Sequence, residues 1–251
     1  MVGDTKEIVL ALSGGGARGA YHIGVLQYLD DNDIKVKAIC GTSIGSIIAA
    51  SYASGVSPKE QLEIFKSKGL KKMFSFAWFR ESLFNVNVNI PCIDALIKKS
   101  RFEELDIPVC ITAMDLQNGN EIYFSSGDIR TLCTASSALV PMFKPVEHEG
   151  KVLVDGGFFN HMPYKPLKKY DYPLVGVNLN PIVKKASRPR LMSYLKKVIA
   201  IRMFITADSQ RDEYDYYISN DEILKYSIFS LKNFDELFEL GYADAKKVFS
   251  V

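Results

Sequence analysis

Two glycine-rich turns, each lying between an apolar run and a segment of helical periodicity, constrain the fold of this chain most strongly. The first apolar run, Ile8–Leu12, is followed by the turn Gly14–Gly19. The second, Val36–Cys40, is followed by the turn Gly41–Gly45. After each turn, apolar residues recur at helical spacing. This strand–helix–strand–helix order predicts parallel strands that are covered by helices.

Later segments extend the same pattern. Further strands are predicted at Pro108–Met114, Glu121–Phe124, Lys151–Val154 and Leu174–Asn178. Further helices are predicted after the Ser57 N-cap, from the Asp128 N-cap to Ser137, over Leu191–Ala207 and over Asp235–Val248. We therefore predict an α/β fold, a three-layer sandwich with a mainly parallel central sheet. No linker divides the chain, so we expect a single domain over residues 1–251, with a motif-bearing core over 6–180 and a helical C-terminal part over 181–251.

The composition excludes several classes of function. The 31 Lys and Arg residues nearly balance the 29 Asp and Glu residues, and the net charge of +2 gives no support for a nucleic-acid partner. The four cysteines show no C-x-x-C spacing and the three histidines are not at ligand spacing, so we expect reduced thiols and no metal. No apolar leader precedes the first strand, and no stretch reaches the roughly 18 apolar residues of a membrane span. These features predict a cytoplasmic protein.

The first glycine turn has the G-x-G-x-x-G spacing of a dinucleotide-binding loop, in Gly14, Gly16 and Gly19. Bare amides at a helix start bind any anion, however, including the oxyanion of a transition state. A dinucleotide site also needs an acidic residue after the second strand, where this chain has Cys40-Gly-Thr42. No lysine followed by serine or threonine closes the glycine run, so a P-loop is excluded as well. We therefore expect no nucleotide cofactor.

The second glycine turn, Gly41-Thr-Ser43-Ile-Gly45, is a G-x-S-x-G sequence between a strand and a helix. In this setting a serine sits on a sharp turn with its hydroxyl projecting above the sheet. Glycines on both sides remove the Cβ atoms that would clash, and the helix start favours nearby negative charge. Ser43 is therefore a candidate nucleophile.

Two residues are candidates for the base that this serine needs. Asp155 follows a predicted strand and precedes Gly156-Gly157, so its carboxylate stands at a strand end with little steric cover. It can accept the Ser43 proton directly, although Asp-Gly is also the commonest sequence of a simple turn. His161 gives the alternative order Ser…Asp…His of an α/β-hydrolase esterase. The other histidines are assigned to a partly buried helix position (His22) and an exposed turn (His148).

The three glycine-rich sequences together resemble the patatin-like phospholipases. The resemblance rests on Gly14-Gly-Gly16-Ala-Arg18-Gly19, on the Ser43 elbow and on Asp155-Gly156-Gly157, and it includes the block Thr134–Val146. It covers Lys6 to Asn180. It implies a patatin-like fold and a Ser–Asp dyad, with Ser43 as nucleophile and Asp155 as general base. It also implies an oxyanion hole of Gly14, Gly15 and Gly16 amides, with motif support from Arg18, Gly19, Gly41, Gly45, Gly156 and Gly157.

Two positions depart from the family pattern. Ser13 stands where plant members usually carry aspartate, and His161 stands where asparagine is frequent. Neither belongs to the dyad. Arg18 matches the basic position of the family, and we expect it to brace the glycine loop rather than to meet an acidic lipid headgroup.

The resemblance predicts a serine acyl hydrolase that cleaves acyl esters of phospholipids or related lipids through an acyl-serine intermediate, without metal or other cofactor. The alternatives are a catalytically silent lipid-binding or scaffold module on the same fold, and an esterase that uses His161. The substrate would be met at a membrane surface, where the protein binds peripherally. Two segments that mix apolar and basic residues are candidates for this contact, Leu70–Phe84 and, second, Leu191–Ala207. The oligomeric state is left open.

Overall fold

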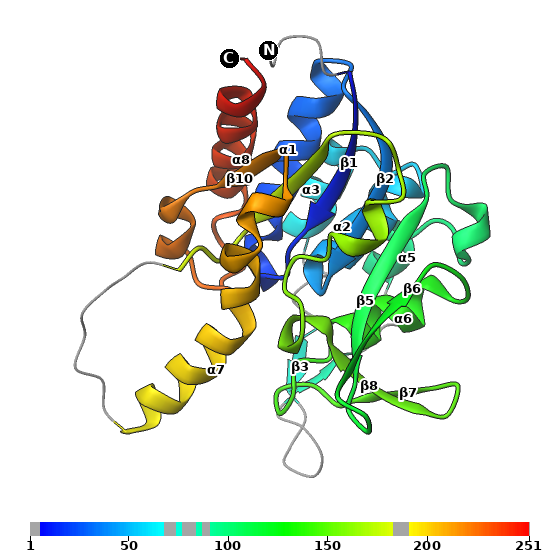
Figure 1. Cartoon of the computed structure of the whole chain (residues 1–251), viewed down its shortest axis with the longest axis vertical. Coiled ribbons are helices and arrows are strands. Elements are labelled where there is room, and N and C mark those ends of the chain that lie inside the picture. The colour runs from blue at the N-terminus through cyan, green and yellow to red at the C-terminus, as the bar shows by residue number, and fades with distance from the viewer. Residues whose placement is uncertain (1–5, 68–73, 77–83, 87–90, 183–190, 251) are drawn as a thin grey trace.

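The computed structural model of the chain describes residues 6–67, 74–76, 84–86, 91–182 and 191–250. Its centre is a mixed sheet of eight strands with helices against it (Figure 1). The strand order is β10-β9-β1-β2-β5-β8-β7, and β6 pairs with β5. The strands are β1 (Glu7–Leu12), β2 (Lys35–Thr42), β5 (Val109–Asp115), β6 (Asn120–Phe124), β7 (Val146–His148), β8 (Lys151–Asp155), β9 (Leu174–Asn178) and β10 (Tyr216–Ser219).

One half of the sheet is parallel and the other is antiparallel. Strands β10, β9, β1, β2 and β5 run in the same direction, whereas β6 and β8 run against β5, and β7 runs against β8. The predicted α/β fold with a mainly parallel sheet is thus confirmed. Strands β7 and β10, which are only 3 and 4 residues long, were not predicted from the sequence.

Strand β5 brings the C-terminal ends of β2 and β8 together. It pairs with β2 over Val109–Thr112, with β8 over Ala113–Asp115 and with β6 over Ile111–Asp115. A strand has two edges, and β6 overlaps the pairing of both β2 and β8, so β2 and β8 share the opposite edge. They approach each other there from opposite directions. The last residue of β2 therefore lies against Thr112, and the last residue of β8 lies against Ala113.

Each face of the sheet is covered. Along β1, Ile8, Leu10 and Leu12 join the larger apolar core, while Val9 and Ala11 join a smaller one on the other face, as the two-residue period of a strand requires. The larger core is formed with α1 (Ala20–Asp31), α2 (Ile44–Ala53), α3 (Pro58–Lys66), α5 (Pro91–Leu96), α6 (Ile129–Ser136) and α8 (Phe234–Phe249). The smaller core includes Tyr164, Leu167 and the end of α7 (Leu191–Ser209) at Ala207. The expected three layers are present.

Both predicted N-caps are formed. Ser57 and Glu60 make a reciprocal capping box at the start of α3, and Asp128 accepts a hydrogen bond from the Thr131 amide at the start of α6. The α6 cap matters for the site because α6 carries a residue that contacts the Ser43 turn. The local sequence thus fixes where this helix begins.

The C-terminal helix packs tightly on the first helix. A Cβ on Gly24 of α1 would lie 1.9 Å from the Phe238 carbonyl oxygen, and a Cβ on Gly241 of α8 would lie 2.1 Å from the Tyr21 carbonyl oxygen. The two backbones therefore touch where the helices cross. This contact joins the C-terminal part to the motif-bearing core.

The structure also bears on the predictions for His148, for Leu70–Phe84 and for the cysteines. His148 is the last residue of β7 and its side chain is partly buried, with its ring against Phe124, so the exposed turn expected there is wrong. Within Leu70–Phe84, Phe74–Phe76 forms strand β3 and Phe84 begins strand β4 (Phe84–Val86), and the rest lies outside the described residues. Cys40, Cys110 and Cys133 are buried free thiols, while the side chain of Cys92 lies outside the described part.

Candidate active site

Ser43 occupies a sharp turn between β2 and α2. Its backbone angles are φ 53° and ψ −125°, a conformation that non-glycine residues seldom adopt and that is typical of functional sites. A Cβ on Gly45 would lie 2.4 Å from the Leu12 carbonyl oxygen, and one on Gly41 would lie 2.5 Å from the Gly45 carbonyl oxygen. Backbone therefore packs on backbone around Ser43, and this packing holds the strained turn in place.

Ser136 connects this turn to strand β5. The Ser43 amide donates a hydrogen bond of 2.8 Å to Ser136 Oγ, and the Ser136 hydroxyl donates one of 2.6 Å to the Thr112 carbonyl oxygen. Ser136 is fully buried at the end of α6. It satisfies the one backbone donor of the strained residue and ties it to the strand on which β2 and β8 meet. Ser136 lies within the block Thr134–Val146 but was not predicted as a site residue.

Asp155 ends β8 and is buried, in contrast to the open setting expected from its sequence. The loop after α6 covers it, and its amide donates to the Ala138 carbonyl oxygen. One carboxylate oxygen accepts a hydrogen bond of 2.8 Å from the Gly157 amide. Burial raises the pKa of Asp155 from 3.8 to about 6, while hydrogen bonding from Gly157 and from the Ser43 side chain opposes the rise. The carboxylate is therefore ionised at neutral pH and more basic than an exposed aspartate.

The glycine loop lies against Ser43. A Cβ on Gly14 would be 3.3 Å from Ser43 Cβ, so only a glycine leaves this gap open. Gly16 has φ 57°, and a Cβ there would lie 2.4 Å from the Ile228 carbonyl oxygen. The Gly14 amide donates to the His161 carbonyl oxygen, whereas the amides of Gly15 and Gly16 donate no hydrogen bond to any described residue. Of the three predicted oxyanion-hole amides, these two are unengaged.

Arg18 braces this loop from inside the protein. Arg18 is 8% exposed, and its guanidinium donates to the carbonyl oxygens of Tyr226 and Leu179 and to Asn180 Oδ1. Within the described part of the chain no carboxylate pairs with it, and burial lowers the pKa of Arg18 to about 10. The Asn180 amide in turn donates to the Gly14 carbonyl oxygen. These contacts favour the bracing role over headgroup binding.

Two buried histidines flank the same loop. His22 donates through Nε2 to the Ser13 carbonyl oxygen, and burial lowers its pKa to about 4. His161 lies on the loop after Asp155, is 1% exposed, and accepts a hydrogen bond from Asn180 at Nε2. Burial lowers the pKa of His161 to about 3, so its ring is neutral. No described carboxylate pairs with His161, although a histidine base needs an acid to orient it.

The remaining supporting glycines fit tightly around the site. A Cβ on Gly156 would lie 2.5 Å from the Thr112 carbonyl oxygen, and one on Gly157 would lie 3.0 Å from Asp155 Oδ1. Gly19, at the end of the glycine loop, lies against the Ile44 side chain of α2. The three predicted sequence motifs are thus brought together by the fold.

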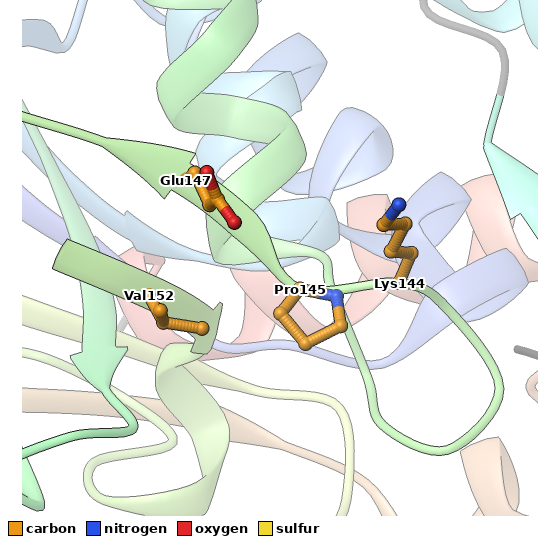
Figure 2. Close-up of a pocket in the computed structure, with 4 residues that line it drawn as sticks. All are labelled: Lys144, Pro145, Glu147 and Val152. Atoms are coloured by element: carbon orange, nitrogen blue, oxygen red, sulfur yellow. The ribbon is translucent and has the colours of Figure 1, made fainter. Parts of the chain in front are cut away.

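A hollow elsewhere on the surface is not part of this group. It has a volume of about 560 Å³ and is lined by Lys144, Pro145, Glu147 and Val152 around the β7–β8 hairpin (Figure 2). None of these is a predicted site residue.

Two further features are absent from the described part of the chain. No three His, Cys, Asp or Glu side chains gather in a way that could hold a metal ion. None of the described helices combines the length and the apolar character that a membrane span requires.

Ser43 thus lies on a strand-to-helix turn of the kind that forms a nucleophile elbow, with bare amides and a buried carboxylate beside it. The chain belongs to the patatin-like phospholipase family, whose sequence model matches residues 10–168. This match begins within β1 and ends after the Asp155 loop. It therefore includes all three predicted motifs.

Known relatives agree with this assignment. The chain is 26% identical over 179 residues to an uncharacterized NTE family protein of Mycobacterium tuberculosis, a match that covers 70% of this chain and 50% of the relative. It is 27% identical over 176 residues to lysophospholipase NTE1 of Cryptococcus neoformans, which covers 65% of this chain and 10% of the relative. Patatin-like phospholipase domain-containing protein 6 of Mus musculus is 26% identical over 283 residues, a match that covers 97% of this chain and 20% of the relative. The chain spans half or less of the length of these relatives.

Solved structures share the fold. VipD of Legionella pneumophila superposes with a TM-score of 0.54 at 13% identity, covering 98% of this chain and 67% of VipD. The type III effector protein ExoU superposes with a TM-score of 0.52 at 15% identity, covering 98% of this chain and 53% of ExoU. At these identities the likeness concerns the fold alone.

The Ser136 bridge leads to a first prediction. Ser136→Ala leaves the Ser43 amide without its acceptor and the strained turn untied from β5, so we expect reaction of Ser43 with a fluorophosphonate probe to slow by about 10- to 100-fold. The rate is measured by intact-protein mass spectrometry. Unfolding experiments on the same variant should show a loss on the order of 1–3 kcal/mol.

Ser137→Ala is the matched control, because the neighbouring Ser137 hydroxyl has no partner among the described residues. We expect this variant to react like the wild type. Equal labelling rates for Ser136→Ala and Ser137→Ala would show that the bridge does not position Ser43.

Proposed function

We propose that this protein is a serine acyl hydrolase that cleaves acyl esters of phospholipids or related lipids with a Ser43–Asp155 dyad. One observation carries the proposal: β2 and β8 meet end to end on one edge of β5, so that a strained serine and a buried carboxylate stand side by side. Membership of the patatin-like phospholipase family supports a lipid hydrolase. The relative named as a lysophospholipase supports a glycerophospholipid substrate.

The reaction has two halves. Asp155 accepts the Ser43 proton while Ser43 Oγ attacks the ester carbonyl carbon, and the amides of Gly15 and Gly16 stabilise the oxyanion. The tetrahedral intermediate collapses, Asp155 passes the proton to the leaving alcohol, and acyl-Ser43 remains. Water then attacks the acyl group with Asp155 as base, and the free acid leaves with Ser43 restored.

The state of the two candidate bases favours Asp155 over His161. The raised pKa of about 6 makes the Asp155 carboxylate a stronger base while it stays ionised at neutral pH. His161 already accepts a hydrogen bond at Nε2 and has a pKa of about 3. A group with so low a pKa is too weak a base to accept the serine proton efficiently. A silent scaffold is disfavoured because both Ser43 and Asp155 are present in reactive settings.

Helix α7 supports contact with a lipid surface. Tyr194, Val198, Ile201 and Ile205 recur at helical spacing on one face and are 52%, 62%, 40% and 45% exposed. The other face of the helix packs beside the site. Met203 Cε lies 3.1 Å from the position that a Cβ on Gly157 would take, and the Phe204 ring centre lies 4.7 Å from that of His161. The helix extends outward from the body of the molecule (Figure 1).

We assign this apolar stripe to a phospholipid bilayer. An exposed row of large apolar side chains is unusual on a soluble surface, and this row lies on the helix that packs against Gly157 and His161 beside the proposed site. The exposed Arg202 on the same helix can meet lipid phosphates. An acyl chain that enters from the bilayer would thus reach Ser43 by displacing α7. This location agrees with the second candidate segment, Leu191–Ala207.

The dyad leads to a second prediction. Ser43→Ala and Asp155→Asn should each lower turnover of a soluble short-chain ester by about 10⁴-fold or more. In the wild type, kcat/KM should rise with pH through an apparent pKa near 6 and then level, because Asp155 accepts a proton only when ionised. Initial rates between pH 4.5 and 8.5 measure both effects.

Asp115→Asn is the control for loss of a buried carboxylate, because Asp115 only caps the turn at Gln117 and Asn118. It should keep near-normal turnover. If His161→Ala were as damaging as Asp155→Asn, a histidine-based triad would replace the dyad.

The α7 stripe leads to a third prediction. Changing Val198, Ile201 and Ile205 to serine should weaken binding to phosphatidylcholine–phosphatidylglycerol vesicles by about 10-fold or more, since each substitution removes exposed apolar area that the bilayer would bury. Vesicle sedimentation measures the binding. Turnover of a soluble ester should stay within about threefold of the wild type.

Leu116→Ser is the matched control, since Leu116 is 48% exposed on a turn after β5. It should bind vesicles like the wild type. Unchanged binding of the triple variant would refute the assignment of the stripe to a bilayer.

A further inference from the structure

One ring nitrogen of His161 has no function in the Ser43–Asp155 reaction. Nδ1 is buried and has no hydrogen-bond partner among the described residues. An unpaired buried polar atom is unfavourable, so such atoms are few in folded proteins. The surroundings of Nδ1 show what it can bind.

The protonation of the ring follows from its neighbours. The Arg18 guanidinium can only donate, and its Nη1 lies 2.6 Å from Asn180, which therefore presents Oδ1 to it. The Asn180 Nδ2 then faces the Gly14 carbonyl oxygen and His161 Nε2, each at 2.9 Å. Because Nδ2 can only donate, Nε2 must accept, and the ring proton is on Nδ1.

Nδ1 lies near Gly14 of the glycine loop and near Gly157, which follows Asp155. A Cβ on Gly14 would lie 3.4 Å from Nδ1 and 3.3 Å from Ser43 Cβ. A Cβ on Gly157 would lie 3.4 Å from Nδ1 and 3.0 Å from Asp155 Oδ1. The two glycines thus keep side chains out of a gap that Nδ1, Ser43 and Asp155 border together.

We propose that His161 is a catalytic residue that donates a hydrogen bond from Nδ1 to the carbonyl oxygen of the ester under attack at Ser43. The inference rests on the proposed acyl hydrolase function and adds a third donor to the amides of Gly15 and Gly16. No proton is transferred: Nδ1 keeps its hydrogen while the oxygen gains negative charge and then loses it when the intermediate collapses. Arg18 and Asn180 are positioning residues, because they fix which ring nitrogen carries the proton.

A neutral imidazole suits this role. It stabilises the growing negative charge and does not compete with Asp155 for the proton of Ser43. Burial lowers the pKa of His161 to about 3 and so keeps the ring neutral. Phe204 packs against the ring and Met203 lies against Gly157, so displacement of α7 by an acyl chain also opens the way to Nδ1. Such a hydrogen bond strengthens as the oxyanion forms and therefore acts on kcat more than on KM.

The test compares two variants of equal shape. In His161→Asn the amide nitrogen takes the δ position and can donate, whereas His161→Leu has the same branching and no donor. With a soluble ester, we expect kcat of His161→Asn within about 10-fold of the wild type and kcat of His161→Leu lower by about 100-fold, with similar KM values. Equal kcat values for the two variants would show a packing role only and overturn the proposal.

A second measurement uses the unmodified protein. Nitrogen-15 NMR of histidine-labelled wild type should show His161 as the Nδ1–H tautomer, with that proton shifted after Ser43 reacts with a fluorophosphonate, whose phosphoryl oxygen takes the oxyanion position. An Nε2–H tautomer, or a resonance that phosphonylation leaves unchanged, would contradict the proposal. A wild type that neither hydrolyses esters nor labels at Ser43 would instead contradict the proposed function and remove the basis of this inference.

Discussion

The meeting of β2 and β8 on one edge of β5 is the constraint on which the rest of the site depends. Because β2 ends against Thr112 and β8 ends against Ala113, the turns that follow them must occupy the same small volume. Glycines at positions 45 and 156 allow these turns to touch neighbouring backbone, at the Leu12 and Thr112 carbonyl oxygens. The same crowding excludes water from Asp155 and raises its pKa to about 6. Strand pairing, close packing and carboxylate basicity are therefore consequences of a single topological feature.

Side chains distant in the sequence stabilise this arrangement. Ser136 ties the strained turn to β5, and Arg18 with Asn180 ties the glycine loop to the end of β9. Each of these groups makes at least two hydrogen bonds to other parts of the protein, which limits motion of the loops around Ser43. The unengaged donors are the amides of Gly15 and Gly16 on the glycine loop and Nδ1 of His161, which lies near Gly14 and Gly157. This pattern is consistent with a site prepared for a developing oxyanion, in a member of the patatin-like phospholipase family.

Much of this could be predicted from sequence, because strand and helix periods, capping residues and glycine turns are local signals. The two N-terminal strand–turn–helix units, the caps at Ser57 and Asp128 and the α/β fold follow from them. The burial of Asp155 could not be predicted, since it arises from an antiparallel strand meeting a parallel one and from the loop at Ala138. Ser136 and Asn180 carry no motif of their own, and their partners Ser43 and Arg18 are 93 and 162 positions away. Strands β7 and β10 are too short to show a period.

The central claim, that the meeting strands bury an ionised carboxylate beside Ser43, is tested most directly by the pH dependence of stability. The folded protein binds the Asp155 proton more tightly than the unfolded chain does, so this group's stabilising contribution is present below pH 3.8 and is lost as pH rises through about 6. Asp155→Asn has no such loss. We predict that its advantage in unfolding free energy over the wild type grows by about 1–2 kcal/mol between pH 5 and pH 7.5, as measured by urea denaturation. A difference between the two proteins that does not change over this range would contradict the account.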